Sequence, residues 1–169
     1  MRLLALAPLV AALLLATSCD LADASLGAGE AQAQTSSASR LDWNDDQVRW
    51  YGHREGLAHA AANGLDVLYV EYATWCPHCV RASAFFHDPR IVELAKKFVL
   101  VRADTDALGR GNERYLLDGR YVPRFVFLDP QGRPRAALTT GQQEFRYFYS
   151  AEEKDVLVAN MRRLVAARR

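Results

Sequence analysis

Short apolar runs alternate with amphipathic stretches along residues 41–169. Three of these runs are mostly apolar, as in strands buried on both faces of a sheet: 66–71, 98–101 and 125–128. Between the first two runs the pattern favours helices at 76–86 and 91–97, separated by a break at Pro89. We therefore expect a strand–helix–strand unit with parallel strands and a right-handed crossover.

Further elements flank this unit. The Ala-rich segment 53–62 predicts a helix that ends before Gly64, a residue that commonly terminates helices. Residues 129–132 predict a turn, after which 135–138 is expected to return as an antiparallel strand. Residues 151–167 have the apolar stripe of an amphipathic helix. The predicted order is βαβ, then a β-hairpin, then a helix, which is an α/β domain with a central mixed sheet flanked by helices.

Two segments between these elements have weaker patterns. Residues 112–117, within a polar and Gly-punctuated stretch, are expected to be helical. Phe145, Tyr147 and Tyr149 alternate with polar residues, which we interpret as a half-buried strand. The same alternation is also compatible with an apolar substrate surface.

The chain begins with a signal-like segment. Arg2 precedes an apolar run over 3–16, which is shorter than the roughly 20 residues that a membrane-spanning helix needs. We therefore interpret residues 1–18 as a secretory signal peptide. Residues 19–40 are rich in small and polar side chains that cannot form a core, and they predict a flexible tether to a domain at 41–169.

Cys19 closes the signal-like segment. The sequence from Leu15 to Cys19 resembles a bacterial lipobox, although Ala16 stands where that motif prefers Leu. The resemblance implies cleavage before Cys19, a lipid on its sulfur and attachment to the periplasmic face of a bacterial membrane. Ordinary cleavage after the small residues of 22–24 or 31–33, giving a soluble periplasmic protein, is the alternative.

Composition excludes several classes of function. The chain has 21 Lys and Arg against 20 Asp and Glu, so its net charge of +1 offers no footprint for nucleic acid. A charged fraction of 24% argues against disorder, and three cysteines are too few for a disulfide scaffold. Because Cys19 is either acylated or removed, two thiols remain in the domain.

Those two thiols form the strongest chemical signal, in the sequence from Trp75 to Cys79. The pair follows a predicted strand and begins a predicted helix, where unpaired N–H groups and the helix dipole stabilise a thiolate. We therefore expect Cys76 to be the attacking thiol and Cys79, one turn later, to be more buried and to resolve a mixed disulfide. Pro77 fits the first helical turn, and His78 can bring positive charge beside the thiolate.

Three other interpretations of the pair stay open. A structural zinc site needs more ligands, and no second cysteine pair is present. A structural disulfide closing so short a loop constrains the unfolded chain little. A binding-only module of the same fold is the third, although the presence of both Cys76 and Cys79 argues against it. We expect no metal and no cofactor besides the Cys76–Cys79 redox pair.

A strand, Trp-Cys-x-x-Cys and a helix, followed later by Val-Pro before another strand, resemble the thioredoxin superfamily. The resemblance implies that Pro123 is cis and faces the redox pair, that Trp75 shields the pair, and that Val122 and Pro123 supply backbone for a substrate strand. Residues 118–130 are similar to the anterior gradient proteins and related small endoplasmic-reticulum proteins of the disulfide isomerase group. The Cys-Pro-His-Cys motif itself is similar to that of periplasmic thiol oxidases.

The sequence departs from that family at one buried position. Many relatives have an acid six residues before the first cysteine, where this chain has Val70, and Glu71 lies one residue later on the opposite face. Proton transfer from Cys79 would then use water, or Glu71 after a register shift. The chain also ends without an endoplasmic-reticulum retrieval signal, so we expect a bacterial envelope location.

Together these features predict an exported thiol–disulfide oxidoreductase that acts on protein thiols and disulfides and is recharged by a redox partner. Pro77 and His78 favour a stabilised thiolate, hence an oxidising or isomerising protein. The alternatives are a tethered reductant, for example in cytochrome c maturation, and a non-catalytic client-binding module.

Overall fold

The computed structural model describes residues 41–109 and 111–168. The predicted signal peptide, Cys19 and the tether over 19–40 lie outside them. Within the described residues, no helix combines the length and apolar character needed to cross a bilayer.

The centre of the domain is a four-stranded mixed sheet in the order β1-β3-β2-β4. Its strands are β1 (Trp50–Tyr51), β2 (Val67–Tyr72), β3 (Val99–Asp104) and β4 (Arg124–Leu128). β3 runs parallel to both β1 and β2, whereas β4 pairs antiparallel with β2. The three predicted strands and the parallel pairing of the first two are confirmed. The two-residue strand β1 was not predicted.

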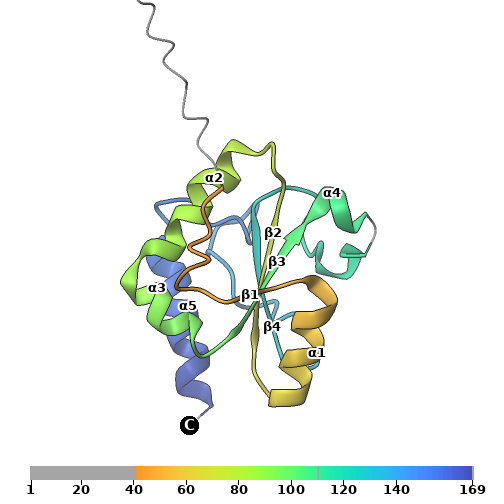
Figure 1. The fold of residues 1–169 in the computed structure, drawn as a ribbon. Helices are drawn as coiled ribbons and strands as arrows, with labels where there is room; N and C mark the ends of the chain where they lie inside the picture. Colours follow the sequence, from red (N-terminus) through yellow and green to blue (C-terminus); the bar gives the residue numbers. More distant parts are fainter. Residues whose placement is uncertain (1–40, 110, 169) are drawn as a thin grey trace, which may run out of the picture. The chain divides into compact units, whose positions relative to one another are not determined.

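Helices cover both faces of this sheet (Figure 1). They are α1 (His53–Asn63), α2 (Pro77–Ser83), the 3₁₀ turn η1 (Ala84–His87), α3 (Pro89–Ala95), α4 (Thr105–Leu108), the 3₁₀ turn η2 (Glu113–Tyr115) and α5 (Lys154–Ala167). α2, α3 and α5 lie on one side, with α1 and α4 on the other (Figure 1). Successive strand residues point to opposite faces, so Val70 packs with the α3 and α5 side and Tyr69 with the α1 side.

Two predicted strands are wrong. Residues 135–138 make no strand; the return segment has only an isolated bridge between Leu128 and Pro134. Pro134 has no N–H to extend a ladder, and the amide of Leu138 turns back onto the carbonyl of Arg135 at 2.9 Å. The predicted hairpin is therefore a turn with a single bridge.

The aromatic segment over 145–149 is not a strand either. Phe145 has a left-handed backbone, φ 49°, and its carbonyl accepts from the amide of Phe148 at 2.8 Å, which closes a turn. Tyr147 and Tyr149 are buried, while Phe145 is 54% exposed. The turn thus separates one solvent-facing aromatic ring from two core rings.

Helix boundaries also shift. The predicted helix over 76–86 divides into α2 and η1, and the helix expected at 151–167 begins at Lys154. The segment 112–117 contains only the short turn η2. Each change affects an end or a short element, where helix formation is least cooperative.

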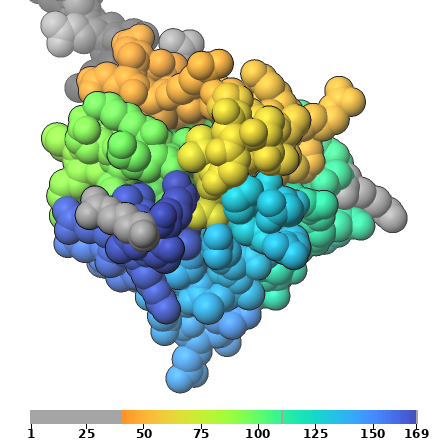
Figure 2. Space-filling view, turned by 90° about the horizontal axis from the view of Figure 1, so that it is seen from below, coloured from red at the N-terminus to blue at the C-terminus, as the bar shows by residue number. Residues whose placement is uncertain are grey.

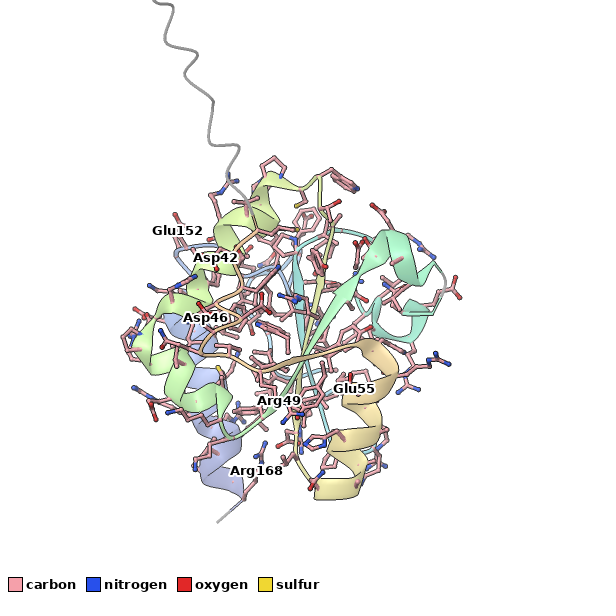
Figure 3. The ribbon with its side chains drawn as sticks, viewed as in Figure 1. Asp42, Asp46, Arg49, Glu55, Glu152 and Arg168 are labelled. Carbon is pink, nitrogen blue, oxygen red and sulfur yellow. The ribbon has the colours of Figure 1, made fainter. Side chains whose placement is uncertain are left out.

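Asp66 joins three segments at the end of the domain opposite α2. One of its carboxylate oxygens accepts from Arg135 at 2.6 Å and the other from Arg168 at 2.6 Å. The segment before β2, the turn after β4 and the end of α5 adjoin on this face (yellow, cyan and dark blue in Figure 2), and Figure 3 labels Arg168 there. Arg168, at the end of α5, is thus held in an ion pair by a carboxylate that is itself buried.

Candidate active site

Cys76 lies at the start of α2, as the sequence predicts. It is the N-cap residue, and its Sγ accepts a hydrogen bond from the amide of Cys79 at 3.2 Å. Pro77 occupies the first turn, where a missing N–H costs no helical hydrogen bond. The sequence of the motif thus places the Cys76 sulfur at a helix start, within reach of a backbone N–H.

Cys79 lies deeper than Cys76. It is fully buried and packs in a small cluster with Ala73. Burial raises the pKa of the Cys79 thiol strongly, and the contact with Cys76 raises it further. Both cysteines are free thiols, and Cys79 stays protonated at neutral pH. The structure therefore gives the two sulfurs unequal chemistry.

Val122 and Pro123 face the pair from the loop before β4. The Val122–Pro123 peptide bond is cis, as predicted. The Cys76 thiol donates to the Val122 carbonyl at 3.6 Å, and the Val122 side chain packs on the cysteine cluster. Two loops far apart in the sequence thus meet at Cys76.

His78 has a different partner from the one expected. Its ring is exposed, accepts at Nδ1 from an Arg81 guanidinium nitrogen at 2.9 Å, and lies edge-on to Phe148 at 5.4 Å. The Arg81 guanidinium therefore places a positive charge next to this ring, and Arg81 was not selected from the sequence.

Trp75 is open to solvent, with 68% of its surface exposed. Its indole Nε1 donates to the Asp106 carboxylate on α4 at 2.8 Å. This hydrogen bond fixes the ring between the start of α2 and α4.

A cavity of about 450 Å³ opens beside Cys76. Five predicted site residues line it: Trp75, Cys76, Pro77, His78 and Val122. Seven further lining residues were not selected from the sequence, and Asn112, Tyr121 and Arg124 are among them. The cavity leaves room for a substrate next to the Cys76 sulfur, whereas Cys79 is outside its lining.

Below the cavity is a buried polar network. Glu71 accepts from the Arg124 guanidinium and from the Asn112 amide, the latter at 2.7 Å. Arg124 also donates to the Gly119 carbonyl. Burial lowers the pKa of Arg124 to about 10, so the side chain stays charged at neutral pH. The sequence signal for this pair was one charged residue in each of two otherwise apolar strands, Glu71 in β2 and Arg124 in β4.

The network corrects one expectation about Glu71. Val70 points into the apolar core, and Glu71 lies on the opposite face, as expected. The suggested route from Cys79 to Glu71 by a register shift is wrong, because β2 pairs Glu71 directly with Arg124 and the carboxylate is already bound.

Comparison with known proteins agrees with this architecture. A family model described as thioredoxin-like matches residues 49–130. Anterior gradient protein 2-B of Xenopus laevis is 31% identical over 154 residues, which cover 89% of this chain and 88% of that protein. The chain belongs to the thioredoxin superfamily. Within the superfamily it is related to the anterior gradient proteins, as the resemblance of residues 118–130 predicted.

Other thioredoxin-like proteins match more distantly. Anterior gradient protein 3 of Mus musculus is 27% identical over 72% of this chain and 73% of its own length. The solution structure of a thioredoxin from Thermus thermophilus has a TM-score of 0.53 and 24% identity, covering 70% of this chain and 88% of that one. The structural match shows the thioredoxin fold.

Metal ligands do not gather in this thioredoxin-like domain. Among residues 41–109 and 111–168, no three His, Cys, Asp or Glu side chains are grouped as a metal site would need.

Proposed function

We propose that this protein is a thiol–disulfide oxidoreductase in which Cys76 is the attacking thiol and Cys79 the resolving thiol. The observation that carries the proposal is the unequal placement of the two sulfurs. Cys76 caps α2 and lines the cavity, whereas Cys79 is fully buried behind it with a raised pKa. Cys76 is itself only 3% exposed, so a client would reach its sulfur through the cavity. Sequential disulfide exchange requires one sulfur that a client can reach and a second one that is protected.

The reduction half-reaction proceeds in two exchanges. The Cys76 thiolate attacks a client disulfide, forms a mixed disulfide and releases one client thiolate, which takes up a proton. Cys79 loses its proton to water, attacks the Cys76 sulfur and releases the second client thiol. Two electrons pass to the client, and the Cys76–Cys79 disulfide remains. The reverse sequence oxidises a client dithiol, and a redox partner then removes the two electrons.

Oxidation or isomerisation is the direction we favour. The Cys79 amide donates to the Cys76 sulfur, and a hydrogen bond of this kind supports the reduced form and hence a higher reduction potential. We further propose that the protein works in the cell envelope on protein clients, exported by residues 1–18 and anchored through a lipid on Cys19. Mass spectrometry of the mature N-terminus tests the anchor; an unmodified start at Gln34 would eliminate it.

Single Cys76→Ser and Cys79→Ser variants, together with the double variant, test the proposal. We expect loss of activity in refolding of a scrambled disulfide substrate for all three, and accumulation of a mixed disulfide only for Cys79→Ser. Full activity of the double variant would contradict the enzymatic role. Equilibration with glutathione measures the direction, and a potential near about −270 mV, the value of thioredoxin, would instead indicate a reductant.

A further inference from the structure

Two large hydrophobic side chains are strongly exposed in the described part of the chain, Trp75 and Phe145. They come from segments far apart in the sequence, and each is connected to the cavity beside Cys76 in a different way. Trp75 lines it directly, and Phe145 packs edge-on against Tyr121, another lining residue, with ring centroids 5.1 Å apart. Exposed apolar side chains gathered at one site mark an interaction surface.

These rings are held in place before any partner binds. The Trp75 indole is hydrogen-bonded to Asp106. Asp118 accepts from the Tyr121 hydroxyl at 2.6 Å and from the Arg146 amide at 2.6 Å, so one carboxylate fixes both Tyr121 and the segment next to Phe145. Because the rings are already ordered, binding to them loses little conformational entropy.

The backbone of Phe145 supports the same role. Its φ of 49° is left-handed, a conformation that is unfavourable for a bulky side chain. The resulting turn places the ring against Tyr121 and in solvent, while its neighbour Tyr147 is buried. Strained conformations that expose a side chain occur where that side chain binds something.

The cavity between these rings suits one large apolar side chain. Its volume of about 450 Å³ falls within the roughly 300–1,000 Å³ of typical ligand pockets. Leu116 and Val122 add apolar walls, and Cys76 is part of the same lining. When a client is joined to Cys76 by a disulfide, the client side chain that enters the cavity therefore belongs to a residue next to the client cysteine.

The arginines that line the cavity are each paired with an acid. Arg124 pairs with buried Glu71, and Arg120 reaches Glu113 at 3.4 Å. The Asp106 carboxylate, which accepts from the Trp75 indole, lies beside the same site. The exposed apolar rings, and not a net charge, therefore distinguish this surface.

We infer that Trp75, Tyr121 and Phe145 form a specificity surface for extended client segments with an aromatic or large aliphatic residue next to the reacting cysteine. This inference rests on the proposed function, because the client must form a disulfide with Cys76.

The test uses the full-length chain with Cys79→Ser, which prevents resolution. The probes are short peptides whose cysteine carries a thionitrobenzoate group and is preceded by Phe, Ala or Lys. The Cys76 thiolate attacks the peptide sulfur, and coloured thionitrobenzoate leaves as a thiolate. We expect the Phe peptide to react at least about tenfold faster than both the Ala peptide and the Lys peptide.

Two variants isolate the contribution of Phe145. Phe145→Gly, which accepts the left-handed turn, should reduce the Phe-to-Ala rate ratio several-fold, and Phe145→Tyr should restore it. Glu144→Ser, an exposed change in the same loop, should leave the ratio unchanged.

Each remaining outcome has a distinct meaning. If the Cys76→Ser variant releases thionitrobenzoate as fast as the chain that keeps Cys76, the peptides do not react through Cys76. The proposed function then fails. If Cys76 reacts but all three peptides have equal rates, or Phe145→Gly preserves the ratio, the specificity surface is refuted while the function stands. A Phe145-dependent dimer in sedimentation with no change in the ratio would assign the surface to a second copy of the chain and also refute the inference.

Discussion

The Glu71 carboxylate pairs with the Arg124 guanidinium directly across strands β2 and β4, and both side chains are almost fully buried. Arg124 also binds the Gly119 carbonyl, and its guanidinium lies 5.3 Å from the centre of the Tyr121 ring. The pair thereby connects the sheet to the loop that carries Val122.

Removing one partner of this pair should destabilise the domain strongly. Arg124→Met leaves the Glu71 charge buried with only Asn112 as a partner, and we expect a loss of about 3–5 kcal/mol in the free energy of unfolding. The double variant Glu71→Gln/Arg124→Met, which buries no charge, should be more stable than the single variant. Urea unfolding measures both.

A surface ion pair provides the matched control. Arg133 pairs with Asp129 while 75% of its side chain is exposed, so Arg133→Met should cost less than about 1 kcal/mol. Equal stability of Arg124→Met and the double variant would show that the destabilisation does not come from the uncompensated charge of Glu71.

The two active-site thiols should differ in alkylation. Because burial raises the pKa of Cys79 while Cys76 lines the cavity, iodoacetamide should label native Cys76 at least about tenfold faster than Cys79. Peptide mass spectrometry distinguishes the sites, and in concentrated urea the difference should disappear. Comparable native labelling of both would contradict the proposed roles.

The sequence predicted the features that depend on apolar runs and on short motifs. Strands β2, β3 and β4 and the helix start at Cys76 follow from local residue patterns. The cis bond before Pro123 was implied by the resemblance to the thioredoxin superfamily. Features set by tertiary contacts were missed. The alternation from Phe145 to Tyr149 looks like a strand, but the turn and the core decide which rings are buried.

Site residues follow the same division. Cys76 and Cys79 are visible in a motif, whereas Asp106 and Arg81 join the site only because folding brings α4 to Trp75 and one helical turn brings Arg81 to His78. Their surface-like sequence context gives no signal of either contact.

His53 should make stability depend on pH. Its Nδ1 lies 2.6 Å from the Tyr69 hydroxyl, whose pKa is raised by burial, so the phenol donates to a neutral imidazole. Burial, followed by the charges of Arg114 and Arg54, lowers the pKa of His53 below 6.5. The unfolded chain therefore binds the proton more readily, and the stability contributed above pH 6.5 is lost as the pH falls through the folded-state pKa.

Urea unfolding from mildly alkaline to mildly acidic pH measures this effect. The loss should stay below the roughly 1.4 kcal/mol of one full pKa unit, because His53 is only partly buried and solvent screens it. His53→Gln should flatten the pH dependence. An unchanged slope in His53→Gln would assign the dependence to other groups.

Gly56 lets α1 approach the sheet closely, and its replacement should be harmful. A Cβ at this position would lie 2.4 Å from Val101 Cγ2 and 2.9 Å from Tyr51 Cβ. Alanine favours a helix interior by up to about 1 kcal/mol over glycine, but overpacking costs about 1–3 kcal/mol. We therefore expect Gly56→Ala to lower the free energy of unfolding, as measured in urea.

A second substitution identifies the steric cause. In the Gly56→Ala background, Val101→Ala removes the clashing methyl group, so the two changes together should cost less than the sum of their separate effects. Gly52→Ala serves as the control, since no atom lies within 4 Å of the added methyl and only a weak change at the helix cap is expected. Additive costs for Gly56→Ala and Val101→Ala would mean that close contact with β3 does not require glycine at this position.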